Sequence, residues 1–293
     1  MRNQEIKRLA VKSRDSLRSD IIKRYLNNKS AVFGAVILIV ILVCCVFADF
    51  IVPRELVTKY NVSEKLLPPS TLHLFGTDNL GRDIFARVLH GARISVGIGV
   101  GATLASLMIG AAIASICAVF KKTDFIIMRI IDIITCVPAI LLALVLLAVL
   151  GGNIFNMILT LAIVSVPGFA IRIRSVLLSV VEQDYVQAAR LSGTSTLKLI
   201  LKHILPNAID PIIVDATMTT SSMMLSAAGL SFIGVGIAPP APEWGAMLNY
   251  AQQYFQTKPY MAIIPGAAIT ITALSINLVG DGLRDALDPK TGR

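Results

Sequence analysis

Charged residues are scarce in this chain of 293 residues, where Asp, Glu, Lys and Arg together make up 15% of the sequence. Soluble globular domains usually carry about a quarter of charged residues. Apolar residues make up 55%, and the mean hydropathy is +0.74. This composition excludes an ordinary water-soluble protein, and we expect most of the molecular surface to face a lipid bilayer.

The sequence also lacks the short motifs of common catalytic and nucleotide-binding sites. No Gly is followed by Lys, which excludes a Walker loop, and neither Gly-x-Ser-x-Gly nor His-Glu-x-x-His occurs. The three histidines, His73, His90 and His203, lie far apart in different loops. We therefore expect no catalytic residue, no metal site and no cofactor in this chain. Any uphill transport would then take its energy from an ion gradient or from a partner protein.

Cysteine is rare and carries no pairing signal. Cys44, Cys45, Cys117 and Cys136 all lie in apolar segments, without a Cys-x-x-Cys pair or a nearby histidine. We interpret them as small buried hydrophobic residues rather than as disulfide partners or metal ligands.

Positive charge is in excess, with a formal net charge of +9. The basic residues lie at the ends of apolar runs rather than on an aromatic-rich surface. This distribution is typical of the positive-inside rule and disfavours a nucleic-acid partner.

Long apolar runs dominate the rest of the chain and predict an all-α integral membrane protein with about six transmembrane helices. The first run follows a basic segment that is too long for a cleaved signal peptide. The six runs are residues 31–52, 94–119, 126–149, 154–171, 208–233 and 260–280. The predicted organisation is a cytoplasmic N-terminal segment 1–30, a first transmembrane helix 31–52, an extracytoplasmic loop 53–92, a five-helix core 93–283 with a cytoplasmic loop 172–206, and a cytoplasmic tail 284–293.

Orientation follows from the distribution of Lys and Arg between the loops. With six alternating helices, the basic N-terminal segment, the Lys121–Lys122 turn and the loop 172–206 share one side. The loops 53–92, 151–153 and 237–259 are nearly neutral and share the other side. We therefore predict that both termini are cytoplasmic.

Small residues recur every four positions in the second run, at Ala102, Ser106, Gly110 and Ala114. Small side chains let helix backbones approach closely inside a membrane, so this stripe predicts a helix-packing face. The nearby Gly97-x-Gly99-x-Gly101 does not have the spacing of a nucleotide-binding loop.

The loop 172–206 carries the most informative pattern in the chain. Residues 181–191 favour a helix, which Gly193 would end. Thr194 or Ser195 could cap a second short helix, which Pro206 would close. The small residues at this corner would let a partner pack closely against it, and an amphipathic helix pair at the membrane surface is the simpler alternative.

This loop resembles the cytoplasmic signature of ABC importer permeases, Glu-Ala-Ala-x3-Gly-x9-Ile-x-Leu-Pro. Ala188, Ala189, Gly193, Leu205 and Pro206 match it, whereas Gln187 stands at the Glu position and His203 at the Ile position. The two departures suit the peptide and nickel branch of that family. Three further segments resemble the second, C-type permease of dipeptide, oligopeptide, glutathione and nickel importers, namely residues 75–95, 230–247 and 277–289.

The resemblance implies a type I ABC importer transmembrane fold, a location in the bacterial inner membrane, and a loop that docks on an ATPase subunit. The residues that would couple to the ATPase are Gln187, Ala188, Ala189, Arg190, Gly193 and His203. The implied partners are a second homologous permease, two ATPase subunits and an extracytoplasmic solute-binding protein. ATP and Mg²⁺ would be bound by the ATPase subunits and not by this chain.

The fifth run is unusually polar for a membrane span. Polar groups at membrane depth are found where they meet protein or a water-filled path, so we expect this helix to line the translocation path. The candidate path residues are Asp215, Met218, Thr219, Ser222, Met223 and Ser226. In the alternative, the hydroxyls bond to their own helix backbone, the methionines fill the core, and Asp210 and Asp215 lie near the helix start.

Trp244 is the only tryptophan, and we expect it to be an interfacial anchor rather than a contact for the binding protein.

The substrate remains open between peptides, which we take as the first expectation, and glutathione or nickel chelates. An ion-coupled secondary transporter is the rival from another class. Such a transporter would require inverted repeats and carboxylates near the midplane. Apart from the acids of the fifth run, Asp132 is the one acid within a predicted span, and it lies near the cytoplasmic end of that span.

Overall fold

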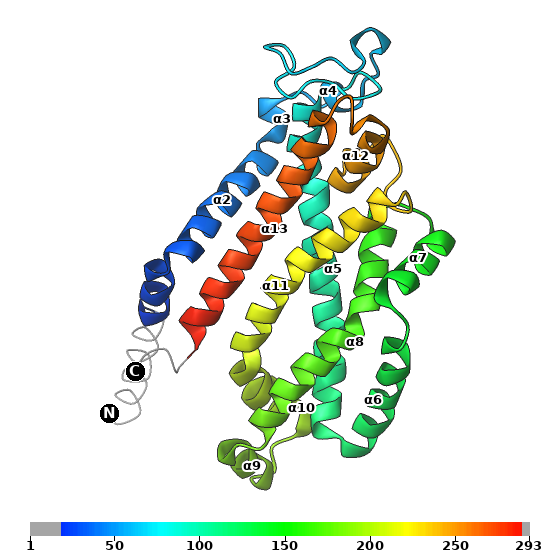
Figure 1. Cartoon of the computed structure of the whole chain (residues 1–293). Coiled ribbons are helices and arrows are strands. Elements are labelled where there is room, and N and C mark those ends of the chain that lie inside the picture. The colour runs from blue at the N-terminus through cyan, green and yellow to red at the C-terminus, as the bar shows by residue number, and fades with distance from the viewer. Residues whose placement is uncertain (1–18, 289–293) are drawn as a thin grey trace.

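The computed structural model describes residues 19–288, and helices form almost all of this part of the chain (Figure 1). No strand occurs in this range, where a single antiparallel bridge joins Thr77 and Asp83. Residues 19–27 are helical and lead into the named elements. These are α2 (Lys29–Val46), α3 (Ala48–Ile51), α4 (Glu55–Thr58), η1 (Val62–Glu64), α5 (Ile84–Val119), α6 (Lys121–Thr135), α7 (Ala139–Leu150), α8 (Ile154–Val181), α9 (Asp184–Leu191), α10 (Thr196–Leu199), η2 (Ile200–Ile204), α11 (Leu205–Phe232), α12 (Trp244–Ala251), η3 (Gln252–Tyr254) and α13 (Tyr260–Leu287).

Between residues 19 and 288, four helices are long and apolar enough to cross a membrane: α2, α5, α8 and α13. The pair α6 and α7 would make a fifth span if it is counted as one. By length and composition α11 is not among them, because its hydroxyl and carboxylate residues lower its hydropathy. It nevertheless packs between α5 and α13, at the place of the fifth predicted run, 208–233 (Figure 1).

The predicted span 126–149 is wrong as a single helix, because α6 and α7 meet at an angle of 83°. The break lies at Cys136–Pro138. Pro138 disfavours helical backbone at the residue before it, and its own nitrogen cannot donate a hydrogen bond. Cys136 is exposed at this break, so the prediction that it is buried is also wrong.

Two predicted boundaries shift because helices continue through charged residues. α5 begins at Ile84, inside the predicted loop 53–92, where Asp83 caps it by accepting a hydrogen bond from Ala86 N at 2.8 Å. α8 continues to Val181, ten residues beyond the predicted end of its span. Ile173 and Leu177 are buried on the continuing helix. Side-chain periodicity, rather than the first charge, therefore marks where these helices end.

The small-residue stripe of α5 is a packing face, as predicted. Ala102, Ser106 and Ala114 are fully buried. A Cβ placed on Gly110 would lie 2.7 Å from Cβ of Phe169 on α8, closer than real side chains approach. The absence of a side chain at Gly110 thus allows α5 and α8 to pack against each other.

The ends of the helices fall into two groups (Figure 1). The α9–α10 corner lies at the same end as the α5–α6 turn, the start of α2 and the end of α13. At that end Asn28 caps α2 and donates to Asp285 of α13 at 3.0 Å. The segments α3, α4 and α12 lie at the opposite end. The described loops are therefore divided between the two ends as predicted, whereas residues 1–18 of the predicted N-terminal segment lie outside the described residues.

A buried polar network organises the end that carries α3, α4 and α12. Arg82, whose side chain is fully buried, donates from Nε to Asp78 at 2.7 Å. Arg87, also buried, donates to the carbonyl oxygen of Val57 at 2.9 Å. His73 Nδ1 lies 2.8 Å from Asp83, the cap of α5. Buried charges persist when they are paired and hydrogen-bonded, so this network fixes the loop to the start of α5.

Trp244 belongs to this interior, and its predicted role as an interfacial anchor is wrong. It is 2% exposed, and its Nε1 donates to the carbonyl oxygen of Val88 at 2.9 Å. Glu243 caps α12 by accepting from the backbone N–H groups of Gly245 and Ala246. Burial raises the pKa of Glu243 above its ordinary value, and these hydrogen bonds oppose that rise. Together they seat α12 inside the bundle, where neither lipid nor a partner reaches the indole ring.

Candidate functional site

The corner between α9 and α10 is the first candidate site. α9 ends through Gly193, which has φ +77°, a conformation that residues with a side chain rarely adopt. Thr194 N donates to the carbonyl of Ala189 at 3.2 Å, and Ser192 N donates to Ala188 at 3.0 Å. The predicted role of Gly193 as the end of the helix is confirmed. The helix begins at Asp184 rather than at 181, because α8 occupies the chain up to Val181.

Buried apolar residues fix this corner to the helix bundle. Val186, Leu199 and Ile204 are each at most 1% exposed. Gln187 donates from Nε2 to the carbonyl of Val181 at 2.8 Å, which ties α9 to the end of α8. The corner is therefore a rigid extension of α8 and α11.

Large apolar side chains also project outward from the same corner. Leu191 is 89% exposed and Leu197 is 68% exposed, and Ala188 and Arg190 are exposed beside them. Ala189 and His203 are half-buried. An apolar surface of this kind, with basic groups at its edge, is suited to contact another protein.

The predicted closure of a second helix by Pro206 is wrong. The chain stays helical from Thr196 to Phe232, through α10, the π-type turn η2 and α11. Pro206 lies in the first turn of α11, where a missing N–H is tolerated, and the wider turn before it accommodates the proline ring. The corner is thus continuous with α11, so a movement of α9 and α10 can be transmitted directly to that helix.

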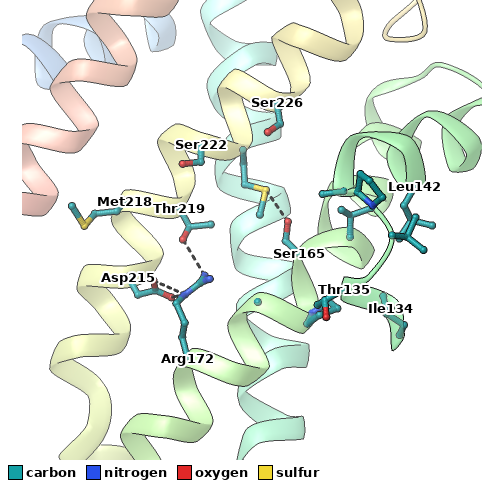
Figure 2. A pocket seen from close by; sticks show the side chains of 17 residues that line it. Ile134, Thr135, Leu142, Ser165, Arg172, Asp215, Met218, Thr219, Ser222 and Ser226 are labelled. Carbon is teal, nitrogen blue, oxygen red and sulfur yellow. Dashed lines mark hydrogen bonds and ion pairs between the residues drawn. The ribbon is translucent and has the colours of Figure 1, made fainter. Parts of the chain in front are cut away.

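A cavity of about 580 Å³ between α8, α11 and the α6–α7 break is the second candidate site (Figure 2). Its lining comes from residues 134–142, 164–172 and 215–226. All six predicted path residues border it: Asp215, Met218, Thr219, Ser222, Met223 and Ser226. The structure therefore brings this predicted set together around one space.

These six residues are not equivalent. Met223 is 4% exposed, and its sulfur accepts a hydrogen bond from Ser165 Oγ at 3.4 Å, so it belongs mainly to the core. Met218 points away from Arg172 in Figure 2 and packs near Gly280 of α13. Thr219, Ser222 and Ser226 make no hydrogen bond to their own helix backbone among the described contacts, whereas Thr217 and Thr220 do. Thr219, Ser222 and Ser226 therefore fit the interpretation of a helix that lines a path. Thr217, Thr220 and Met223 fit the alternative, in which hydroxyls bond to their own helix and methionines fill the core.

Arg172 is a charged residue of this cavity that the sequence prediction misses, because that prediction puts it in the loop 172–206. Its Nε lies 2.8 Å from Oδ1 and 2.9 Å from Oδ2 of Asp215 (Figure 2). Nη2 lies 3.5 Å from Oγ1 of Thr219, and the guanidinium carbon lies 5.0 Å from the ring centre of Phe169. Asp215 is thus ion-paired well inside α11. It does not lie at the helix start, where the alternative interpretation placed it.

The stabilisation that this ion pair contributes is too small to explain why the protein keeps two charged residues here. The Arg172 side chain is 48% exposed and that of Asp215 is 28% exposed. Such solvent-accessible pairs contribute about 0.2–1 kcal/mol, which is small beside the usual cost of a charged side chain within a membrane span. Charges retained at such a cost are commonly functional.

A second pair on the same helix has a different setting. Arg174 donates from Nε and Nη2 to both carboxylate oxygens of Asp124, joining α8 to α6. The exposed fractions of these side chains are 28% and 18%. They border a cavity of about 900 Å³ that is also lined by Gln187 and Arg190 of α9. This pair holds α6 against α8 close to the α9 corner.

Known proteins show similarity along most of the chain. The sequence model of a family described as "Binding-protein-dependent transport system inner membrane component" matches residues 106–293. A second, "N-terminal TM domain of oligopeptide transport permease C", matches residues 16–69.

Three relatives cover nearly the whole chain. The dipeptide transport system permease protein DppC of Alkalihalophilus pseudofirmus is 39% identical, over 92% of this chain and 89% of that protein. The di/tripeptide transport system permease protein DppC of Pseudomonas aeruginosa is 40% identical, over 91% of this chain and 90% of that protein. The glutathione transport system permease protein GsiD of Escherichia coli is 42% identical, over 92% and 89%.

Among solved structures, one described as an amino acid ABC transporter with histidines has a similar fold. The TM-score is 0.53 at 20% identity, over 67% of this chain and 92% of that one. At this identity the similarity concerns the fold alone.

Proposed function

Because the chain belongs to the family of binding-protein-dependent transport system inner membrane components, we propose that it is one of two permease subunits of an ATP-driven peptide importer. It is a multi-pass membrane protein of the inner membrane. In this proposal it forms the translocation path together with a second, homologous permease. Two ATPase subunits bind ATP and Mg²⁺ and hydrolyse the nucleotide, and a solute-binding protein delivers the peptide from outside the cell.

The observation that carries the proposal is the rigid, outward-facing corner at α9–α10. Its exposed apolar residues Leu191 and Leu197 lie beside exposed Arg190. The corner continues into α11, whose polar residues border the 580 Å³ cavity. One helical segment therefore links a partner-binding surface to the candidate path. Gln187, Ala188, Ala189, Arg190, Gly193 and His203 are the proposed coupling residues.

Alternating access gives this geometry a mechanism. Closure of the ATPase subunits would move the α9–α10 corner, and α11 would move with it. The cavity would then be exposed to one side of the membrane at a time. The energy comes from ATP in the ATPase subunits, and the different contacts that the corner makes in their two states couple it to this chain, which carries out no chemical step.

The proposed orientation has both chain termini and the α9–α10 corner in the cytoplasm. Its support is the basic character of the helix ends at the corner's side of the molecule, including Lys121, Lys122 and Arg190.

Peptides are the proposed solutes because both DppC relatives are named for dipeptide or di/tripeptide transport. Glutathione, itself a small peptide, is the alternative suggested by the third relative. Nickel or another metal chelate is the remaining alternative, on the resemblance to nickel importers alone.

Substitution of Leu191 by Asp tests the proposal. The charge should prevent docking of the corner in an apolar groove. The amount of ATPase subunit that co-purifies with the tagged chain should then fall about tenfold or more, as expected for a central contact residue. Leu72→Asp is the matched control, because Leu72 is 87% exposed at the opposite end of the molecule. Equal ATPase recovery from both variants would contradict docking at this corner. Absence of any ATPase from the unsubstituted complex would contradict the importer itself.

A further inference from the structure

Arg172 and Asp215 are the only charged residues among the described side chains that line the 580 Å³ cavity. The rest of the lining is apolar or carries hydroxyl groups, including those of Thr135, Ser165 and Ser222. A solute in this cavity would thus meet one positive and one negative group at a single place, surrounded by neutral partners.

The guanidinium of Arg172 is only partly used by the protein. Nε bonds to Asp215, and Nη2 makes one long contact with Thr219. Within residues 19–288 no hydrogen bond engages Nη1. Arginine presents its N–H groups as a rigid fork that binds a carboxylate through two parallel hydrogen bonds. Nη1, which lies beside Gly168, thus keeps its hydrogen-bonding capacity, on a side chain that is 48% exposed and lines the cavity.

The Arg172–Asp215 pair differs from the Arg174–Asp124 pair, which serves to hold two helices together. Arg174 directs Nε and Nη2 to both oxygens of Asp124, and its side chain is 28% exposed. Arg172 contacts Asp215 through Nε, and its side chain is 48% exposed. Both pairs join two helices, but Arg174 engages two of its nitrogens with the carboxylate, whereas Arg172 engages one and is more exposed.

We propose that Arg172 is a specificity-determining residue that binds a free carboxylate of the transported solute, and that Asp215 holds its guanidinium in place. The ligand class is a small peptide with an unmodified C-terminus. Asp215 neutralises Arg172 when the cavity is empty, while the solute carboxylate engages Nη1 of Arg172. The inference rests on the proposed function and adds the recognition chemistry of its path.

The test measures binding to the complete complex of permeases and ATPases without its solute-binding protein, which removes that protein's own selectivity. Saturation-transfer NMR would compare dialanine with dialanine amide, and glutathione with its glycine amide. The readout is the ratio of acid to amide affinity, which does not depend on the amount of folded complex. Unsubstituted complex should prefer the acid.

Substitutions of Arg172 and of Asp215 are expected to shift the acid preference in opposite directions. Arg172→Met should lower the acid preference about tenfold or more, because a charge-assisted pair of hydrogen bonds is lost. Arg172→Lys keeps the charge without the fork and should give an intermediate ratio. Asp215→Asn should raise the acid preference several-fold, because the cation is no longer neutralised. Arg129→Met, which removes an exposed arginine of α6 outside this cavity, should leave the ratio unchanged.

A purely structural ion pair gives a different pattern, since breaking it from either side would have the same effect. Equal changes in Arg172→Met and Asp215→Asn, or no acid preference in the unsubstituted complex, would overturn the inference. Uptake of dialanine or glutathione by proteoliposomes that contain the unsubstituted complex, ATP and the binding protein reports on the proposed function separately. Uptake with an unaltered binding ratio in Arg172→Met refutes the inference alone, whereas no uptake of either solute refutes the peptide importer.

Discussion

Single residues determine how closely the helices of this molecule approach one another, and Gly110 is the clearest case. An alanine Cβ at this position would lie 2.7 Å from Cβ of Phe169 and 3.1 Å from the backbone nitrogen of Ala170. Neither neighbour is the end of a flexible side chain, so α5 and α8 would have to separate. The van der Waals contacts along the α5–α8 interface depend on this spacing.

Gly110→Ala is therefore expected to destabilise the protein by about 1–3 kcal/mol, the usual cost of overpacking. Gly97→Ala is the matched control on the same helix, because no atom lies within 4 Å of the added Cβ. It should be neutral or stabilise by up to about 1 kcal/mol, through better helix propensity. Thermal unfolding in detergent would compare the two, and a lower Tm for Gly97→Ala than for Gly110→Ala would contradict the packing argument.

Asp49 of α3 gives the stability of the loop end a dependence on pH in the acid range. Hydrogen bonds from Arg54 and Arg93 lower the pKa of its carboxyl from 3.8 to about 2. The folded-state pKa is below the unfolded one, so the ionised carboxylate stabilises the fold at every pH above about 4. This contribution is lost as the pH falls through about 2. The site is solvent-accessible, so the effect on stability is small.

The expected result is that Asp49→Asn has a lower Tm than the unsubstituted protein at neutral pH, and that this difference shrinks between pH 4 and about pH 2. Paired thermal unfolding curves over that range provide the measurement. A difference that stays constant through the acid range would show that the carboxylate charge of Asp49 is not responsible.

At the scale of elements, two interruptions of helix shape the candidate sites. The break between α6 and α7 places residues 134–139 at the edge of the 580 Å³ cavity, which a straight helix would not do. The reversal at Gly193 places Leu191 and Leu197 on the outside of the α9–α10 corner. In both places the backbone, rather than a particular side chain, determines which residues are presented.

The conformation of Gly193 can be tested separately from the space around it. No atom lies within 4 Å of a Cβ built on this residue, whereas its φ of +77° is unfavourable for most side chains. Gly193→Val should therefore strain the backbone by about 1–2 kcal/mol and reduce ATPase activity coupled to solute. Gly193→Asn should retain most of the activity, because asparagine tolerates positive φ. Equal loss in both variants would indicate a steric contact with the partner instead of backbone strain.

At the scale of the whole molecule, the two ends have different roles in the proposed transporter. One end is tied together by the buried polar network around Asp78 and Arg82 and by the buried Trp244. The other end presents the α9–α10 corner (Figure 1). The long helices α5, α8 and α11 run between the ends, so a load applied at the corner is carried through packed helices rather than through loops.

The source of energy distinguishes this importer from an ion-coupled transporter. Uptake by proteoliposomes that contain the complete complex should require ATP on the side of the ATPase subunits. It should continue when a proton uncoupler is added at constant ATP, because no ion gradient is part of the mechanism. The measurement is the initial rate of labelled dipeptide uptake, and a collapse with the uncoupler would favour the ion-coupled rival.

Hydropathy, charge asymmetry and the loop motif were sufficient to predict much of this protein from its sequence. The bilayer requires long apolar helices, so the composition alone predicts the fold class. Small residues at four-residue spacing predict the α5 packing face. The stop at Gly193 follows from backbone sterics, and the family follows from the motif in the loop 172–206.

Only the tertiary structure decided where side chains from different helices meet. A charge in an apolar run resembles the end of a span, so the sequence predicts a loop at Arg172, yet Arg172 lies on α8 and pairs with Asp215 of α11. The sequence predicts Trp244 at the membrane interface, but α12 packs inward and buries it. The bend at Pro138 opens a cavity whose lining comes from three separate segments. Such pairings depend on long-range packing, whereas sequence periodicity records only the local environment of one helix.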